Sequence, residues 1–190
     1  TPEREMAWAE SIGPATLDMI QRSIKKNQED HCSSILVLIN TPGGNLQSTR
    51  LIVEEILRSP APFLCLVYPS GGHAGSAGAI ILQACHVNGA MEATNLGAAT
   101  PVSGEGSQIP EDLRKKLLND TRSWVEGLAE LRKRNIQFSQ EIVTEARAVS
   151  AAEAKKINAI DFVAVKKQDF LEFAQGRSVQ MSESKTLNIQ

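Results

Sequence analysis

The sequence predicts an α/β fold in which a mostly parallel sheet is flanked by helices. Two short, uninterrupted runs of strand-forming residues predict buried strands, SSILVLIN at 33–40 and PAPFLCLVY at 60–68. Between them, LQSTRLIVEEILRS at 46–59 has apolar residues at helical spacing. Because parallel strands need a crossover connection, the strand, helix and second strand indicate a βαβ unit.

The remaining elements follow in chain order. Helical spacing predicts a helix over 14–27 and a short apolar helix from Ser76 to about Cys85. Weaker strands are expected at 87–91 and 95–98. A long helix is expected from about Glu111 to Arg134, packed against the sheet through a stripe of Leu113, Leu117, Trp124, Leu128 and Leu131.

The last forty residues predict three further elements. The segment SAAE at 150–153 has the pattern of a capping box that opens a short helix. AIDFVAV at 159–165 reads as a strand, and the alternating tail at 175–190 suggests a terminal hairpin.

Composition limits the classes of protein. The 190 residues, 42% of them hydrophobic, suit one domain, and the net charge of -2 gives no electrostatic signature of a nucleic-acid partner. The basic cluster LRKRN at 131–135 is short and is interpreted as the solvated end of a helix. No apolar run approaches the ~18 residues of a membrane helix, so the chain itself is expected to be soluble.

The three cysteines are expected to be buried structural thiols. Cys32, Cys65 and Cys85 are odd in number, and no two of them have the C-x-x-C spacing of a redox or zinc motif. No metal site is therefore expected.

Two glycine-rich breaks, TPGGN at 41–45 and SGGHAGSAG at 70–78, point to the site. Each follows a predicted parallel strand and precedes a helix, and ligands of open α/β sheets bind at that edge. The first N–H groups of a helix have no partner within the helix, and glycine lets a ligand approach them closely. Two such helix starts side by side would form an oxyanion hole.

Ser76 stands at the second of these junctions and is a candidate nucleophile. Gly75 and Ala77 on either side leave room for a substrate carbonyl, although Ala74 replaces the first glycine of a G-x-S-x-G motif. A serine in this place can also simply cap the helix, so both roles remain open. A phosphate-binding loop is not expected, because no Gly-Lys-Ser/Thr follows.

A serine nucleophile needs a base. None of the three histidines, His31, His73 and His86, has an evident aspartate partner, so each is interpreted as structural or solvated. A lysine can act as base if it is taken out of water. The expected apolar stripe of the long helix places Lys116 on the flank of the buried face and Lys115 nearly opposite.

Five segments, in order and spacing, resemble a known family. They are LINTPGG (38–44), YPSGGHAGSAG (68–78), NLGAATPV (95–102), LAELRKRN (128–135) and VSAAEAKKINAIDFVA (149–164). Together they resemble the Clp-peptidase-like domain of membrane-bound serine proteases of the NfeD, or stomatin-operon-partner, type. The resemblance covers about residues 34–165.

The resemblance implies a Clp/crotonase-type fold of repeated ββα units. Residues 1–174 would form the Clp-peptidase-like serine protease domain, and residues 175–190 would be a tail or hairpin leading toward a membrane region. The implied activity is an endopeptidase that cleaves hydrophobic segments of membrane-associated proteins such as stomatins. The implied assembly is a homodimer or larger, with the protease domain extracytoplasmic and attached to the membrane through segments absent from this chain.

The resemblance also implies a Ser-Lys dyad of Ser76 as nucleophile and Lys116 as general base, with no metal or cofactor. Gly43 or Gly44, together with the Ala77 amide, would form the oxyanion hole. Gly72 and His73 would contribute to substrate binding, with the peptide added as a strand along 70–74.

Three departures from the family pattern matter. The histidine of classical Clp peptidases would fall within GAATP at 97–101, so a Ser-His-Asp triad is not expected. The segment GGHAG at 71–75, which precedes Ser76, differs from the family's usual sequence before the nucleophile. Residues 1–17 are not expected to supply the family's first strand.

The segment PVSGEGSQIP at 101–110 is expected to be a mobile lid that controls whether Lys116 is desolvated. Two other functions remain open: a crotonase-like enzyme acting on acyl-CoA, and a non-catalytic scaffold that binds membrane-protein segments.

Overall fold

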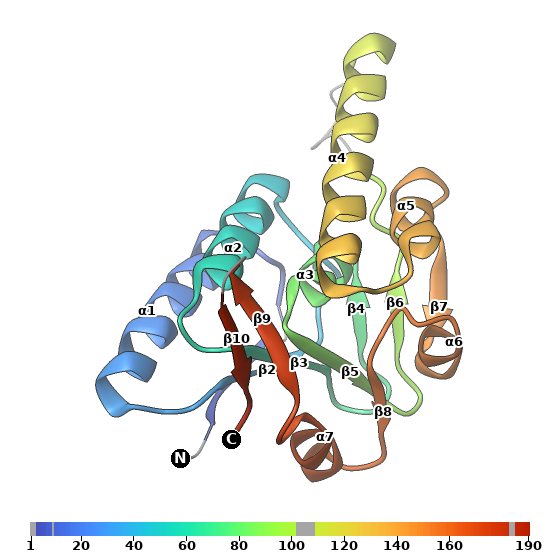
Figure 1. Ribbon diagram of the computed structural model, residues 1–190. Helices are drawn as coiled ribbons and strands as arrows, with labels where there is room; N and C mark the ends of the chain where they lie inside the picture. Colours follow the sequence, from blue (N-terminus) through green and yellow to red (C-terminus); the bar gives the residue numbers. More distant parts are fainter. Residues whose placement is uncertain (1–2, 9, 102–108, 183–184) are drawn as a thin grey trace.

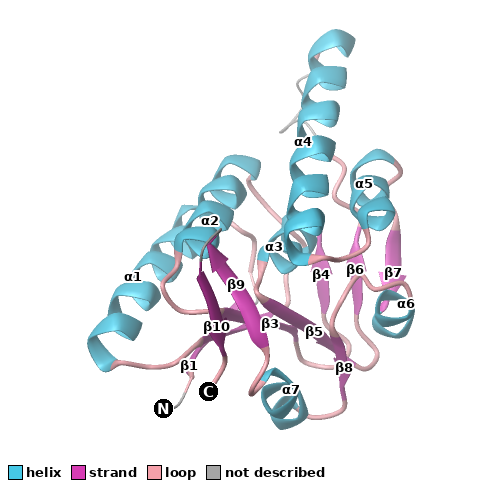
Figure 2. Ribbon diagram, viewed as in Figure 1, coloured by secondary structure: helices cyan, strands magenta, loops and turns pink. Residues whose placement is uncertain are grey.

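The computed structural model describes residues 3–8, 10–101, 109–182 and 185–190, so most of the expected lid, 102–108, lies outside the described residues. A five-stranded parallel sheet forms its centre (Figures 1 and 2). Its strands, in spatial order, are β1 (Arg4–Trp8), β2 (Ile35–Ile39), β3 (Phe63–Val67), β5 (Val87–Met91) and β8 (Phe162–Ala164). The expected α/β class, with a mostly parallel sheet and flanking helices, is confirmed.

Around this sheet lie seven described helices and two smaller sheets. The helices are α1 (Pro14–Asp30), α2 (Leu46–Arg58), α3 (Ala77–Ala84), α4 (Glu111–Arg132), α5 (Ile136–Thr144), α6 (Ala151–Lys156) and α7 (Lys167–Ala174). One small sheet contains β4 (His73–Gly75), β6 (Asn95–Gly97) and β7 (Ala148–Ser150). The other is the expected C-terminal hairpin of β9 (Ser178–Ser182) and β10 (Lys185–Asn188).

The central strands are apolar throughout because both faces of the sheet are covered. Alternate residues of β2 enter two different cores: Val37 packs with residues of α1, α2 and α3, whereas Leu36 packs with α7 and the hairpin. From the hairpin, Val179 is buried in this second core, and Ile189 just after β10 joins it. The C-terminal residues therefore form part of the packed molecule.

The N-terminal segment contains a strand that was not expected. Residues Arg4–Trp8 pair in parallel with β2 over their whole length, with Met6 and Trp8 buried and Glu5 and Ala7 exposed. One face of this edge strand is exposed to solvent, and only Met6 and Trp8 point into the core. It therefore lacks the continuous apolar run from which the inner strands could be predicted.

The long helix α4 does not pack as its apolar stripe predicted. Its first six residues are exposed, and that end projects beyond the rest of the molecule (Figure 1). Leu128 is buried as expected, but Leu113 and Leu131 are 54% and 41% exposed. The second half packs on α3 and α5, and its buried residues are Thr121, Val125, Leu128 and Ala129.

Two of the three cysteines form a disulfide, so the expectation of free thiols is wrong for Cys65 and Cys85. Parallel pairing of Leu64 with Val87 brings Cys85 beside Cys65, and their Cα atoms lie 6.1 Å apart. This proximity arises from the sheet register and has no spacing signature in the sequence. Cys32 is free and half-buried.

The basic cluster after α4 is also not simply solvated. The Arg134 side chain is 1% exposed and forms a 2.8 Å ion pair with Asp161. It also donates to the carbonyls of Gln83 and Cys85. The interpretation of LRKRN as a solvated helix end is therefore wrong for Arg134, because the chain turns inward after Arg132.

His86 beside this cluster predicts a specific loss of stability in acid. Burial, and then the charges of Arg132 and Arg134, lower the pKa of His86 to about 3, against 6.5 ordinarily. Between these values the unfolded chain binds a proton that the folded chain excludes, so His86 destabilises the fold as the pH falls from 6.5 toward 3. Urea unfolding at pH 7 and pH 4.5 should show a contribution of about 2 kcal/mol from this histidine.

The matched variant for this measurement is His86→Asn. In the native chain the His86 Nδ1 accepts the Phe63 N–H at 3.0 Å, and an asparagine oxygen can replace that acceptor without titrating. The variant should lose less stability on acidification than the native chain. Equal losses in the two proteins would contradict the assignment to His86.

No helix in the described part of the chain is both long enough and apolar enough to span a bilayer.

Candidate active site

Ser76 lies between β4 and α3 in a backbone conformation that few side-chain-bearing residues adopt. Its φ is 51° and its ψ is -117°, and its N–H donates to the Gly97 carbonyl at 2.9 Å. It occupies the N-cap position of α3, but its hydroxyl makes no capping hydrogen bond. The expectation that the Ser76 hydroxyl caps the helix is therefore wrong, and the serine holds a strained backbone conformation at the helix start.

The TPGGN loop approaches Ser76 so closely that one of the loop's glycines, Gly43, cannot carry a side chain. Gly43 has a φ of 115°, and a Cβ placed on it would come within 2.5 Å of the Ser76 Cβ. Thr41, which is fully buried, fixes the loop: its hydroxyl oxygen accepts the Gly43 N–H, and its O–H donates to the Glu10 carbonyl. Thr41 was not among the predicted site residues, because a single threonine before a Pro-Gly-Gly turn has no pattern that marks it as part of a site.

Two backbone amides remain free beside the serine. Within the described chain, neither the Gly44 N–H nor the Ala77 N–H has an acceptor, whereas the Gly43 N–H is taken by Thr41. Ala77 is the first residue of α3, so the helix dipole adds positive potential at its amide. Gly44, Ala77 and Ser76 line one cavity, which makes Gly44 the better of the two glycines as an oxyanion donor.

The cavity beside Ser76 has a volume of about 390 Å³. Apart from the serine and its neighbours, its walls are mostly apolar, formed by Leu46, Ile80, Ala99, Pro101 and Leu117. A site of this size and lining can enclose an apolar side chain beside the serine.

Gly72 and His73 do not line this cavity. The N–H groups of Gly71, Gly72 and His73 donate to Ala93, Pro69 and Asn40, in that order. His73 also accepts from Thr41, and β4 pairs with β6. The segment 70–74 therefore has no free N–H at 71–73 for an added peptide strand.

Lys116 is not placed as the helical phase predicted. Both Lys115 and Lys116 are exposed on the projecting end of α4, and Lys115 lies 3.9 Å from Glu111. The expected contrast between a buried-flank lysine and a solvated one is absent, because α4 is buried only from about Leu117 onward. Leu117, the next residue, does line the cavity.

The described residues contain no cluster of side chains suited to bind a metal ion. In the described ranges, no three His, Cys, Asp or Glu side chains gather as potential metal ligands.

Comparisons with known proteins identify the family. The family model "NfeD1b, N-terminal domain" matches residues 8–187. The membrane-bound protease PH1510 of Pyrococcus horikoshii is 30% identical over 164 residues, which is 85% of this chain and 37% of that protein. This chain thus spans little more than a third of the length of that relative.

Two solved structures of the 1510-N membrane-bound stomatin-specific protease are similar throughout. One is a serine-to-alanine mutant, with 25% identity, a TM-score of 0.87, and coverage of 100% of this chain and 93% of that chain. The other is a lysine-to-alanine mutant in complex with a substrate peptide, with 26% identity, a TM-score of 0.89, and coverage of 100% and 88%. By its sequence and its fold, the chain belongs to the family of NfeD1b N-terminal domains.

Proposed function

We propose that this chain is a serine endopeptidase domain that cleaves hydrophobic segments of membrane-associated proteins such as stomatin homologues. The observation that carries the proposal is Ser76, whose hydroxyl makes no capping bond, beside the free amides of Gly44 and Ala77 in an apolar cavity. The similar 1510-N protease is described as stomatin-specific, and one of its structures contains a substrate peptide.

In the proposed reaction, the Ser76 Oγ attacks a peptide carbonyl while Lys116 accepts the hydroxyl proton. The Gly44 and Ala77 amides donate to the oxyanion that forms on the carbonyl oxygen. The lysine then returns the proton to the leaving amine, and water hydrolyses the acyl-enzyme by the same route. No metal or cofactor takes part.

Sequence separation favours Lys116 as the base. The serine and the lysine replaced in the two 1510-N mutants stand 41 positions apart. Ser76 and Lys116 are 40 positions apart, whereas Ser76 and Lys115 are 39 apart. Because desolvation favours the neutral form of an amine, peptide binding next to Leu117 would have to take Lys116 out of water for it to act as the base.

We propose that the intact protein is membrane-bound through segments outside this chain, as its relative is, and that this domain is extracytoplasmic. The Cys65–Cys85 disulfide supports an extracytoplasmic location, because disulfides persist mainly in oxidising compartments. We also propose a homodimer or larger assembly, and a protease domain at 1–174 against whose second core the hairpin of 175–190 packs, with this hairpin as the segment that leads toward the membrane region.

Labelling with a fluorophosphonate that carries a hydrophobic peptide, followed by mass spectrometry, tests the proposed function, because this reagent also fills the cavity next to Leu117. A covalent adduct is expected on Ser76 and on no other serine, because only an activated hydroxyl attacks the reagent. Ser76→Ala should remain unlabelled. Tight binding of coenzyme A without an adduct would instead favour a crotonase-like acyl-CoA enzyme, in which two amides hold a thioester enolate, and would overturn the protease proposal.

A further inference from the structure

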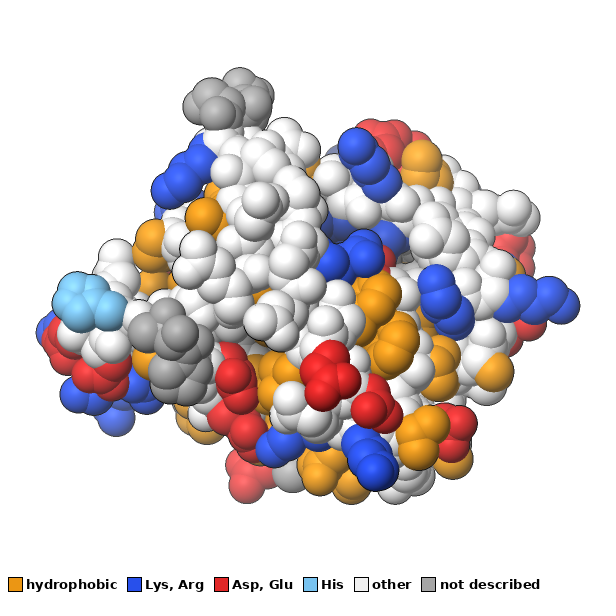
Figure 3. All heavy atoms as spheres, turned by 60° about the horizontal axis from the view of Figure 1, so that its bottom comes forward, with side chains coloured by type: hydrophobic (Ala, Val, Ile, Leu, Met, Phe, Trp, Pro, Cys, Tyr) orange, Lys and Arg blue, Asp and Glu red, His pale blue; other side chains and the backbone are white. Residues whose placement is uncertain are grey.

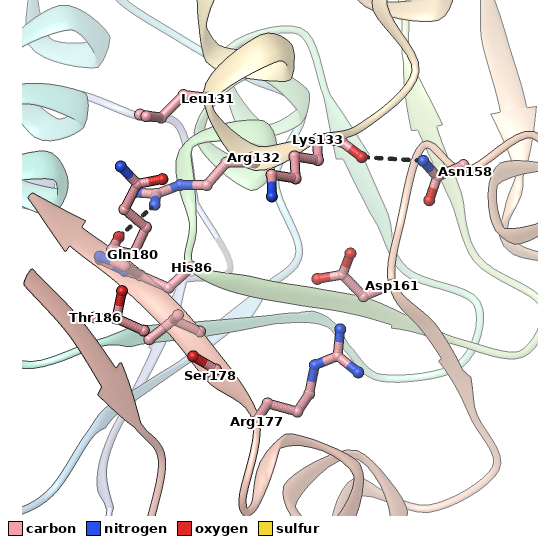
Figure 4. Close-up of a pocket in the computed structure, with 11 residues that line it drawn as sticks. His86, Leu131, Arg132, Lys133, Asn158, Asp161, Arg177, Ser178, Gln180 and Thr186 are labelled. Carbon is pink, nitrogen blue, oxygen red and sulfur yellow. Dashed lines mark hydrogen bonds between the residues drawn. The ribbon is translucent and has the colours of Figure 1, made fainter. Parts of the chain in front are cut away.

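A second cavity, separate from the Ser76 site, lies between the end of α4 and the C-terminal hairpin. It has a volume of about 410 Å³. Its walls come from α4 and its C-cap, β9, β10 and the segment before β8, and Figure 4 shows them around one shared space. The lining side chains with hydrogen-bonding or charged groups are His86, Arg132, Lys133, Asn158, Asp161, Arg177, Ser178, Gln180 and Thr186.

Positive charge in this cavity is in excess. Asp161 is its single acidic lining residue, and both carboxylate oxygens of Asp161 already accept hydrogen bonds from Arg134. Among the described residues, Arg132, Lys133 and Arg177 have no carboxylate within ion-pair distance. On the face drawn in Figure 3, by contrast, basic and acidic side chains are interspersed, so positive charge does not form a broad patch there.

The cationic groups face the cavity from different sides. Figure 4 shows the Lys133 amine and the Arg177 guanidinium extending toward the same space from opposite walls. Arg132 donates through Nε to the Ala84 carbonyl and through Nη1 to the Gln180 carbonyl, which fixes its charge at the wall and leaves Nη2 unused. Burial and the nearby charge of Arg134 lower the pKa of Arg132 to about 10, although the Asp161 carboxylate partly opposes that shift.

A buried donor at the same cavity has no acceptor. His86 is only 7% exposed, and its Nδ1 accepts the Phe63 N–H, so the proton of the neutral ring is on Nε2. That Nε2 has no hydrogen-bond partner among the described residues. A buried polar group without a partner costs free energy, so an acceptor that entered the cavity and reached the His86 Nε2 would be stabilised there.

We propose that this cavity binds a phosphate group. A tetrahedral, multiply charged anion can accept hydrogen bonds from several directions at once, which matches donors on opposite walls better than a planar carboxylate would. The Ser178 and Thr186 hydroxyls supply further donors at the hairpin side. The phosphate can belong to a soluble compound or to a phospholipid headgroup, and the two sources are distinguishable.

Titration of the whole chain with inorganic phosphate at pH 7 tests the site directly. In protein labelled with ¹⁵N at histidine, the His86 side-chain signal should shift saturably, whereas the exposed His31 should not respond. Calorimetry should give the same dissociation constant. Lys133→Gln and Arg177→Gln should each weaken binding at least about tenfold, because each removes a charge-assisted hydrogen bond. Lys25→Gln, which removes one exposed charge elsewhere, should leave the affinity within twofold.

Vesicles identify the source of the phosphate. If it is a lipid headgroup, the chain should sediment with phosphatidylcholine vesicles containing phosphatidic acid but not with phosphatidylcholine alone, and the Lys133 and Arg177 variants should reduce sedimentation. Saturable binding of inorganic phosphate without vesicle binding assigns a soluble source. The proposal is overturned if neither probe shifts the His86 signal, or if Lys25→Gln weakens binding as much as the pocket variants.

Discussion

Replacement of Ser76 with alanine is expected to abolish peptide cleavage while the fold stays intact. The substitution removes the attacking oxygen, and loss of a serine nucleophile lowers turnover by at least about a thousandfold. Stability should change by less than about 0.5 kcal/mol, because the hydroxyl makes no capping hydrogen bond to α3. Chromatography of a hydrophobic peptide substrate, together with thermal unfolding of the same samples, measures both effects.

Ser70→Ala is the matched control for this experiment. Ser70 is an exposed serine in the same glycine-rich segment, and it does not line the Ser76 cavity. Its variant should cleave at the native rate. Turnover that survived in Ser76→Ala would rule out a serine-protease mechanism at this residue.

Elements buried on both faces could be predicted from the sequence. The runs that became β2 and β3 are continuously apolar because α1, α2 and α3 cover one face and α7 and the hairpin cover the other. The glycine-rich breaks could be placed correctly for a related reason, since parallel strands put their carboxyl ends at one edge. Ser76, Gly44 and Ala77 consequently meet in one cavity, as expected.

Features that depend on tertiary placement could not be predicted. The buried face of α4 is set by which part of the helix reaches α3 and α5, and apolar periodicity cannot show that its first turns project into solvent. Leu113 fits the periodic stripe but is 54% exposed. The Cys65–Cys85 bond and the Arg134–Asp161 pair likewise join residues whose proximity exists only in the folded sheet.

Replacement of Lys116 with alanine is expected to lower turnover about 100-fold or more, which is the usual contribution of a general base. Lys116→Arg should be equally inactive, because a guanidinium does not lose its proton at accessible pH and so cannot accept one from Ser76. Both substitutions lie on the exposed end of α4, so thermal stability should be unchanged. A fall in labelling of Ser76 by a fluorophosphonate that carries a hydrophobic peptide should accompany the fall in turnover, because such a reagent fills the cavity next to Leu117 as a substrate does.

Lys115→Ala provides the matched control, since Lys115 is the neighbouring lysine on the same exposed turn and pairs loosely with Glu111 at 3.9 Å. Its variant should keep native turnover and native labelling. The two lysines are alike in exposure in the free chain, so a difference between them can arise only when peptide binding next to Leu117 takes one amine out of water. Equal loss in the Lys115 and Lys116 variants would mean that the projecting end of α4 contributes charge or substrate affinity without supplying a base.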